Sequence, residues 1–234
     1  MEGSSLAGAA PGAVVAIDGP AGAGKSTVAR EVARRLGWSY LDTGALYRGL
    51  TVAALEAGVD LRDGKALAAL APGVAPGPGG EGMRVEGRDV GFRLRDEDVT
   101  EAVVPVSAHP EVRSAMLERQ RSVARESNVV MEGRDIGVEV FPDAPVKIFL
   151  TAALDERARR RAEQLGAHGS PHELADLRDK LARRDHRDTT RPESPLRQAP
   201  DAVVVDSTSR SLEHVVAEVI RIVQGALAPG RETS

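Results

Sequence analysis

The segment GPAGAGKST, residues 19–27, limits the possible folds of this chain more than any other feature. It matches the pattern G-x-x-x-x-G-K-[ST] at every fixed position. An apolar run, AVVAID (13–18), precedes it, and VAREVARRL (28–36) follows with apolar residues at helical spacing. A strand, a glycine-rich loop and a helix in this order predict a phosphate-binding loop, because the loop N–H groups turn toward a phosphate and the helix adds its positive N-terminal end.

Each part of this loop has an expected role toward a nucleoside triphosphate. The ammonium group of Lys25 is expected to reach the β and γ phosphates, and the Ser26 hydroxyl is expected to be a ligand of Mg²⁺. The expected binding residues of the loop are Gly19, Pro20, Ala21, Gly22, Ala23, Gly24, Lys25, Ser26 and Thr27. The loop predicts that a triphosphate binds, but it does not indicate which reaction follows.

The composition excludes several classes of protein. The chain has 234 residues, and no apolar run approaches the roughly 20 residues that span a bilayer, so a membrane protein is excluded. The net charge of −4 argues against nucleic-acid binding, which needs a basic face. There is no cysteine, and Gly169, Ser170 and Pro171 separate His168 from His172, so these two histidines are not expected to share a metal ion.

Short apolar segments alternate with helical ones along the chain. The expected strands are 13–18, 38–42, 128–133, 146–150 and 201–207, and the expected helices are 28–36, 43–58, 109–126, 154–165, 172–188 and 211–227. This alternation predicts an α/β fold with a doubly wound parallel sheet. A glycine- and proline-rich loop (71–83) and a hairpin (83–94) interrupt the alternation, and we interpret about 59–100 as an inserted lobe.

The expected organisation is a single domain over residues 13–226, with tails at 1–12 and 227–234. The N-terminal segment MEGSSLAGAAPG has neither the basic start nor the apolar stretch of a secretion signal. The chain is therefore expected to be a cytoplasmic protein, and we expect it to act as a monomer.

The rest of the sequence favours a small kinase over other proteins that use such a loop. A GTPase needs a guanine-reading Asn-Lys-x-Asp segment, and the chain has no Asn-Lys pair. A motor ATPase is expected to have a strand of four apolar residues that ends in an acidic, metal-holding residue. The candidate for that strand, VVVDS (203–207), comes too late in the chain and ends in serine.

Two arginine-bearing segments could supply the positive charge that a kinase needs. In LDTGALYR, Thr43 lies near a helix start and Arg48 follows about one and a half turns later, which suits an acceptor phosphate. Residues 157–197 have an excess of basic residues and are expected to form a lid. The arginines of interest in the lid are Arg157, Arg161, Arg184, Arg187 and Arg191.

The spacing of these lid arginines suggests two roles. The first two are four residues apart, so they share a helical face toward the triphosphate. The last three recur at i, i+3 and i+7, and together with Lys25 they are the expected catalytic cations, which neutralise charge that develops during transfer. Pro192 is expected to end their helix. For each arginine taken alone, solvation at the surface is an equally simple interpretation.

Five segments in this order resemble those of bacterial cytidylate kinases: IDGPAGAGKST, LDTGALYR, EGRDIG, VFPDAPVKIFL and RRDHRDTTR. The resemblance covers about residues 13–225. It implies ATP- and Mg²⁺-dependent phosphoryl transfer to CMP and dCMP. It also implies a phosphate-loop core with an inserted acceptor-binding lobe and an arginine-bearing lid.

The resemblance also implies which residues hold the acceptor. It places Thr43, Arg48 and Arg134 at the CMP phosphate, Arg113 and Asp135 at the cytosine, Arg184 and Asp188 at the sugar, and Arg191 close to the base or phosphate. Asp135 suits cytosine because a carboxylate accepts from the N4 amino group, whereas uracil has an acceptor oxygen there. Val104 departs from the family, since some members have a serine at the base in this place.

Two alternatives stay open at this point. The chain could be a related kinase that acts on UMP or on a non-nucleotide alcohol. It could also be a nucleotide-gated regulator that binds without efficient transfer, although the missing guanine-reading segment counts against this second alternative.

One short sequence occurs twice, as VEGRDVG (85–91) and as MEGRDIG (131–137). The flanking residues share no pattern, so a structural repeat is excluded. The first copy is expected in a hairpin of the inserted lobe, with its arginine and aspartate facing solvent. The second copy follows a buried strand, which places Arg134 and Asp135 at a strand's carboxyl end, where open α/β sheets bind ligands.

Overall fold

Five parallel strands form the central sheet of the structure, a computed structural model that describes residues 12–166, 170–191 and 193–228. The strands are β1 (Val14–Asp18), β2 (Ser39–Asp42), β6 (Val129–Gly133), β7 (Val146–Thr151) and β8 (Val203–Asp206), in the order β2-β6-β1-β7-β8. All neighbouring strands run parallel, which confirms the predicted α/β fold. Most of the two predicted tails, and His168, lie outside the described residues.

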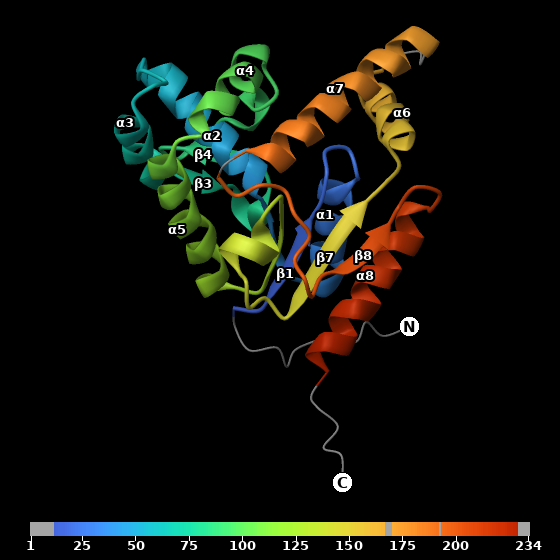
Figure 1. Ribbon diagram of the computed structural model, residues 1–234. Helices are drawn as coiled ribbons and strands as arrows, with labels where there is room; N and C mark the ends of the chain where they lie inside the picture. The colour runs from blue at the N-terminus through green and yellow to red at the C-terminus, as the bar shows by residue number, and fades with distance from the viewer. Residues whose placement is uncertain (1–11, 167–169, 192, 229–234) are drawn as a thin grey trace.

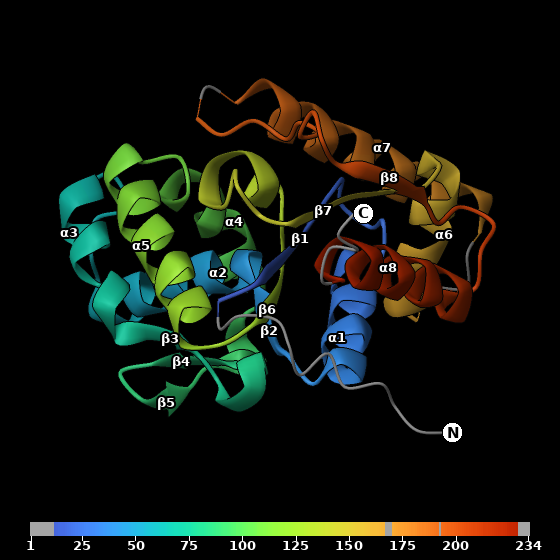
Figure 2. The ribbon, with the colours of Figure 1, turned by 90° about the horizontal axis from the view of Figure 1, so that it is seen from below.

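Helices cover both faces of the sheet because the strands are apolar on both sides. Along β1, Val15 and Ile17 belong to one core, and Val14 and Ala16 belong to a second core on the other face. The first core includes residues of α1 (Lys25–Leu36) and α8 (Leu212–Leu227), and the second includes residues of α2 (Thr43–Ala57) and α5 (Pro110–Glu126). Figure 2 shows the two helix pairs on opposite sides of the strands.

A small lobe lies between α2 and α5 along the chain. Its elements are α3 (Gly64–Ala69), β3 (Val74–Pro76), β4 (Met83–Val85), β5 (Arg88–Asp89) and α4 (Glu97–Val106). The three strands form an antiparallel sheet, so the prediction of a loop over 71–83 is wrong at β3. Val74 is fully buried and opposite Val85, a long-range pairing that the surrounding glycines and prolines hide in the sequence.

Helix α4 is absent from the sequence-based assignment. Its buried residues Val99, Ala102 and Val106 follow helical spacing, but Pro105 lies in its last turn and weakens the pattern. The β4–β5 hairpin, in contrast, is confirmed. Its two turn residues have positive φ, 48° at Glu86 and 76° at Gly87, as a tight hairpin turn requires.

Helices α6 (Leu154–Gln164) and α7 (Pro171–Thr190) pack on each other, and α7 extends over the carboxyl ends of the strands (Figure 1). Helix α7 ends where the sequence predicts, since Arg191 has extended backbone with φ −61° and ψ 142°. All 20 residues of α7 are described, and Leu181 is its one fully buried residue; with the partly buried Leu177 it packs against Ala21 and Ala158. In the described part of the chain, no helix is long and apolar enough to cross a bilayer.

We expect Ile17→Ala to lower the free energy of unfolding by about 2–5 kcal/mol, because it leaves a cavity in the core beneath α1 and α8. Ile17 is 0% exposed, whereas Val203, on the edge strand β8, is 43% exposed. Urea unfolding of both alanine variants measures the difference. Equal losses at Ile17 and Val203 would contradict this description of the core.

Candidate active site

The phosphate loop joins β1 to α1, and its shape requires glycine. Gly19 has φ 149°, and a Cβ there would lie 2.0 Å from the Leu150 carbonyl oxygen in β7. Gly24, at φ 91°, precedes the first residue of α1. The start of α1 has no acidic side chain in its first turn and no side-chain cap. Its N–H groups and positive end are therefore available to an anion.

Lys25 lies at the base of this loop with a side chain that is almost fully buried. Its Nζ donates to the Pro20 carbonyl at 2.8 Å. The pKa of Lys25 is lowered to about 7, mainly by burial and then by the guanidinium groups of Arg134 and Arg184, which Glu132 and Asp18 only partly offset. A phosphate beside Lys25 would reverse this effect, since negative charge favours the ammonium form.

Glu132, the fourth residue of β6, is a site residue that sequence analysis missed. Its carboxylate is buried beside the Ser26 side chain and accepts a hydrogen bond from the Tyr40 hydroxyl at 2.7 Å. Burial raises the pKa of Glu132, while Lys25 and Ser26 oppose that rise. The sequence carries a signal for it, because Val129, Val130 and Met131 form an apolar run that leads directly to Glu132.

Helix α2 starts directly after β2, beside the end of β6. The Asp42 side chain caps this helix, and the buried Thr43 hydroxyl donates to the Glu132 carbonyl at 2.7 Å. A Cβ at Gly133 would lie 2.8 Å from Thr43 Oγ1, so glycine permits this close approach of β6 and α2. Arg48 points toward the inserted lobe and donates to the Leu94 carbonyl at 2.9 Å.

Two ion pairs hold the residues at the end of β6. Arg134 Nε donates to Asp188 Oδ2 on α7 at 2.8 Å, and Arg113 donates to Asp135 Oδ2 at 2.6 Å. The guanidinium of Arg113 also lies 5.8 Å from the centre of the Tyr47 ring. The structure thus brings together Arg113, Arg134, Asp135 and Asp188, which come from three separate parts of the sequence.

The lid arginines lie in different environments. The Arg184 side chain is exposed, but the surrounding protein partly desolvates its guanidinium and, together with Arg134, lowers its pKa to about 10. Arg191 Nη2 lies 3.8 Å from Asp135, and its Nε donates to the Ser194 carbonyl at 2.6 Å. The Arg161 and Arg187 side chains are exposed, so the structure does not gather all five lid arginines at one point.

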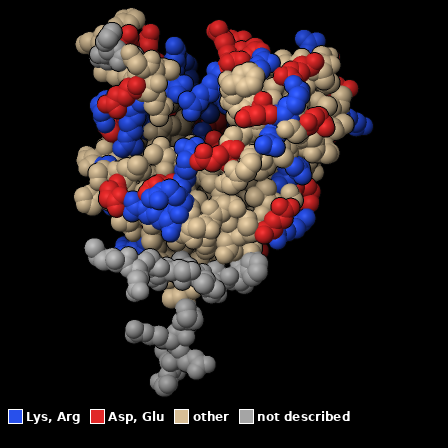
Figure 3. All heavy atoms as spheres, turned by 180° about the vertical axis from the view of Figure 1, so that it is seen from behind, with Lys and Arg blue, Asp and Glu red and all other residues tan. Residues whose placement is uncertain are grey.

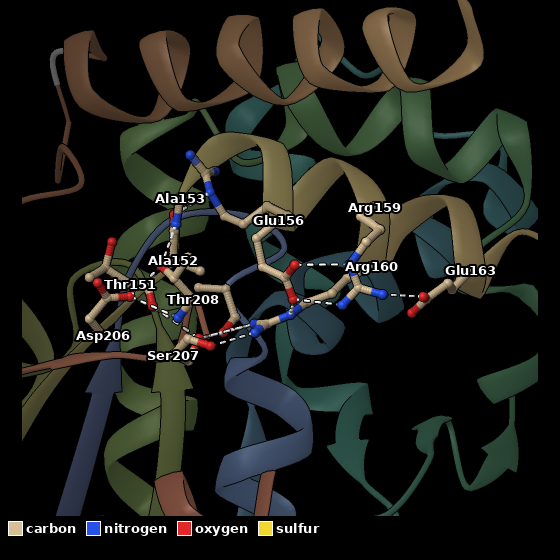
Figure 4. A network of polar contacts seen from close by, with 12 residues as sticks. Thr151, Ala152, Ala153, Glu156, Arg159, Arg160, Glu163, Asp206, Ser207 and Thr208 are labelled. Carbon is tan, nitrogen blue, oxygen red and sulfur yellow. Dashed lines mark hydrogen bonds and ion pairs between the residues drawn. The ribbon is translucent and has the colours of Figure 1, made fainter. Parts of the chain in front are cut away.

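Helix α6 is attached directly to the phosphate loop. The buried Arg157 donates to the Ala21 carbonyl at 2.9 Å and pairs with Asp185 of α7 at 2.6 Å. Arg160 donates to the Ala23 carbonyl at 3.3 Å and to Ser207 Oγ at 3.0 Å, after the end of β8 (Figure 4). Sequence analysis did not identify Asp185 or Arg160, because their partners are distant in the chain.

Taken together, the carboxyl end of the sheet presents cations from the loop, from the end of β6 and from the lid. Seen from behind, the molecule is notched between its two upper lobes, and basic side chains line the notch (Figure 3). Among the described residues, no group of three or more His, Cys, Asp or Glu could hold a metal ion by itself. Such a site suits phosphate groups, and a cation that phosphates help to bind.

Comparisons with known proteins agree with this geometry. A protein named cytidylate kinase from Geobacillus kaustophilus (strain HTA426) is 51% identical over 213 residues, which cover 89% of this chain and 95% of that protein. A second, also named cytidylate kinase, from Pseudomonas aeruginosa (strain LESB58), is 48% identical over 220 residues, which cover 92% and 95%. A solved structure of an uncharacterized protein from Eubacterium ventriosum ATCC 27560 has a TM-score of 0.52 over 91% of this chain and 98% of that chain.

The structural likeness, at 14% identity, supports the fold alone. The sequence comparisons go further, because a family model described as Cytidylate kinase matches residues 15–225. With that match, and with about half of the residues identical to those of both relatives, this chain belongs to the cytidylate kinase family.

Proposed function

We propose that this chain transfers the γ-phosphoryl group of ATP to CMP or dCMP, which gives ADP and CDP or dCDP. The observation that carries the proposal is the meeting of Lys25, Arg134 and Arg184 at the carboxyl edge of the sheet, beside the Arg113–Asp135 pair. The three cations suit two phosphate groups that face each other. The carboxylate suits a base with an amino group.

The donor site is proposed at the phosphate loop, with Lys25 at the β and γ phosphates. Mg²⁺ fits here because the Ser26 hydroxyl and the Glu132 carboxylate are neighbouring hard oxygen groups, and Mg²⁺ takes few protein ligands when phosphates supply the rest. When bound, Mg²⁺ neutralises charge on the β and γ phosphate oxygens. Arg157 holds the loop through Ala21, and Arg161 stays a predicted ATP contact.

The acceptor site is proposed between α2, the end of β6 and α5. Thr43, Arg48 and Arg134 are proposed to hold the CMP phosphate, and Asp135 is proposed to accept from cytosine N4 while Arg113 orients it. Uracil would place an oxygen against the same carboxylate, which disfavours UMP. Arg184, Asp188 and Arg191 are proposed to reach the sugar and base from the lid, and the exposed Arg187 stays a predicted catalytic cation.

The reaction needs no general base in this proposal, because the attacking oxygen belongs to a phosphate that is already an anion. The protein residues hold donor and acceptor in line and offset the repulsion between their negative charges. We further propose that residues 13–226 act as one domain, with 59–100 as the acceptor lobe and 157–197 as the lid. A monomeric state and cytoplasmic residence both stay predictions.

The proposed specificity rests on the Asp135 carboxylate. In a screen with ATP, we expect CMP and dCMP to be phosphorylated much faster than UMP. Asp135→Asn should lower kcat/KM for CMP by about 10- to 100-fold, the size expected when a hydrogen bond to a charged group is lost. The KM for ATP should change less than about threefold, because the phosphate loop is intact.

Asp89→Asn is the matched control, since Asp89 has the same place in the VEGRDVG copy and is exposed. A CMP/UMP preference that survives Asp135→Asn would contradict the base contact. Faster UMP than CMP phosphorylation by the unaltered protein would favour the UMP kinase alternative. No ADP with any acceptor would favour the regulator.

The arginines of the two copies, VEGRDVG and MEGRDIG, should also differ in their effect on activity. Arg134 pairs with the lid residue Asp188, whereas Arg88 pairs with Glu56 on the surface at 2.8 Å. We expect Arg134→Ala to lower kcat/KM for CMP by about 100-fold, because a phosphate contact and a lid contact are lost together. Arg88→Ala should change it less than about twofold, since exposed ion pairs contribute little. Similar losses in both variants would be incompatible with the proposed site.

A further inference from the structure

Asp18 connects the two halves of the proposed site. It ends β1, immediately before Gly19, and its side chain is buried at 5% exposure. One of its carboxylate oxygens accepts from the Ile136 N–H at 2.9 Å, and the other accepts from the Gly137 N–H at 2.8 Å. The residue that precedes the phosphate loop therefore holds the backbone that directly follows Asp135.

These two bonds cap the π-helical turn Ile136–Val140. The first N–H groups of any helix have no partner within the helix, and here a side chain from another strand accepts from two of them. The Asp135 carbonyl accepts from the Glu139 N–H at 2.8 Å in the same turn. The cap thus fixes where Asp135 lies relative to β1.

The stability of the fold does not by itself account for a carboxylate at this position. Burial raises the pKa of Asp18 to about 6, although the Gly137 and Ile136 N–H groups and Lys25 act in the opposite direction. A raised carboxyl pKa means that folding disfavours the charged form. Ionisable groups held at such a cost are concentrated at functional sites.

Direct chemistry is a poor explanation for Asp18. Both of its oxygens already accept main-chain hydrogen bonds, and the proposed reaction needs no base. Its partners lie directly after Arg134 and Asp135, the residues proposed to hold the acceptor phosphate and base. Asp18 is thus placed to act on the acceptor through the backbone.

We propose that Asp18 is a positioning residue that sets the distance and orientation of the acceptor-binding segment Arg134–Ile136 relative to the phosphate loop. It keeps the acceptor phosphate in line with the γ phosphate and keeps the Asp135 carboxylate at the cytosine. The inference rests on the proposed role of Asp135. The inference adds Asp18 as a residue that affects CMP turnover without touching CMP.

Asp18→Asn is the direct test, because the side chain keeps its size but presents an NH₂ group to one of the two N–H donors. We expect kcat/KM for CMP to fall by about 10- to 100-fold, as for the loss of a hydrogen bond to a charged group. UMP turnover should fall less, so the CMP/UMP ratio should decrease. The dissociation constant of ATP should change less than about threefold, since Gly19 packed on β7 keeps the loop in place.

Ile17→Val is the matched control. Ile17 is the neighbouring residue of β1 and lies in the core beneath α1 and α8, so its variant loses stability without touching the capped turn. We expect a lower melting temperature and an unchanged CMP/UMP ratio. If Asp18→Asn behaves like Ile17→Val, with kinetics unchanged, Asp18 is purely structural and the inference is overturned.

Asp135→Asn, measured in parallel, separates this inference from the proposed function. If the CMP/UMP ratio changes in Asp135→Asn but not in Asp18→Asn, the inference about Asp18 is overturned and the proposed base contact stands. An unchanged ratio in Asp135→Asn overturns the base contact, and a preserved kcat for CMP in Asp18→Asn would then overturn the positioning role as well.

Gly137→Ala provides a second test if Asp18→Asn does not fold. A Cβ at Gly137 would lie 3.2 Å from Lys147 Cγ and Cδ. Because Lys147 is buried and its Nζ is held by the Asp201 carboxylate, we expect the capped turn to move by a few tenths of an ångström. We expect a smaller decrease of the CMP/UMP ratio in the same direction. An unchanged ratio in a folded Gly137→Ala protein overturns the inference.

Discussion

The carboxyl edge of the sheet holds several positive charges so close together that they disfavour one another. Lys25 is buried there, and Arg134 and Arg184 both contribute to its lowered pKa. Like charges at such distances repel strongly where water is excluded, so the glycine loop, the sheet and the lid must hold them in place. The phosphates of two substrates would supply the missing negative charge. Substrate binding is therefore expected to reduce the repulsion between these cations.

The lid depends on the same charges. Helix α7 buries Leu181 alone, yet Asp185 pairs with Arg157 and Asp188 pairs with Arg134. Arginine also forms strong, frequently bidentate pairs with phosphate, so a bound phosphate would compete with these carboxylates. If α7 acts as the proposed lid, these ion pairs suit it to respond to phosphates. The end of β6 is held differently from α7. Main-chain hydrogen bonds in the sheet and the close approach at Gly133 fix its position.

Local patterns made much of this structure predictable. The loop at 19–27, the alternating strands and helices, and the end of α7 all depend on residues within one short window. The residues that sequence reasoning missed depend on distant partners. Glu132 is placed in the site by its contacts with Tyr40 and Ser26. Asp18 is placed by its hydrogen bond with Ile136, 118 positions away. A short window can show that an apolar strand leads to an acidic residue, as at Glu132, but only the folded sheet shows which distant groups such a residue meets.

The protonation of Lys25 on ATP binding tests this account most directly. At pH 8, a group with a pKa of about 7 is mostly neutral, whereas beside a triphosphate it should be an ammonium ion. Calorimetric titration of the protein with ATP, in two buffers of different ionisation enthalpy, counts the protons taken up. The account predicts a net uptake of protons on ATP binding at pH 8. ATP binding without proton uptake would contradict the claim that burial and the neighbouring arginines keep Lys25 largely neutral until a phosphate binds.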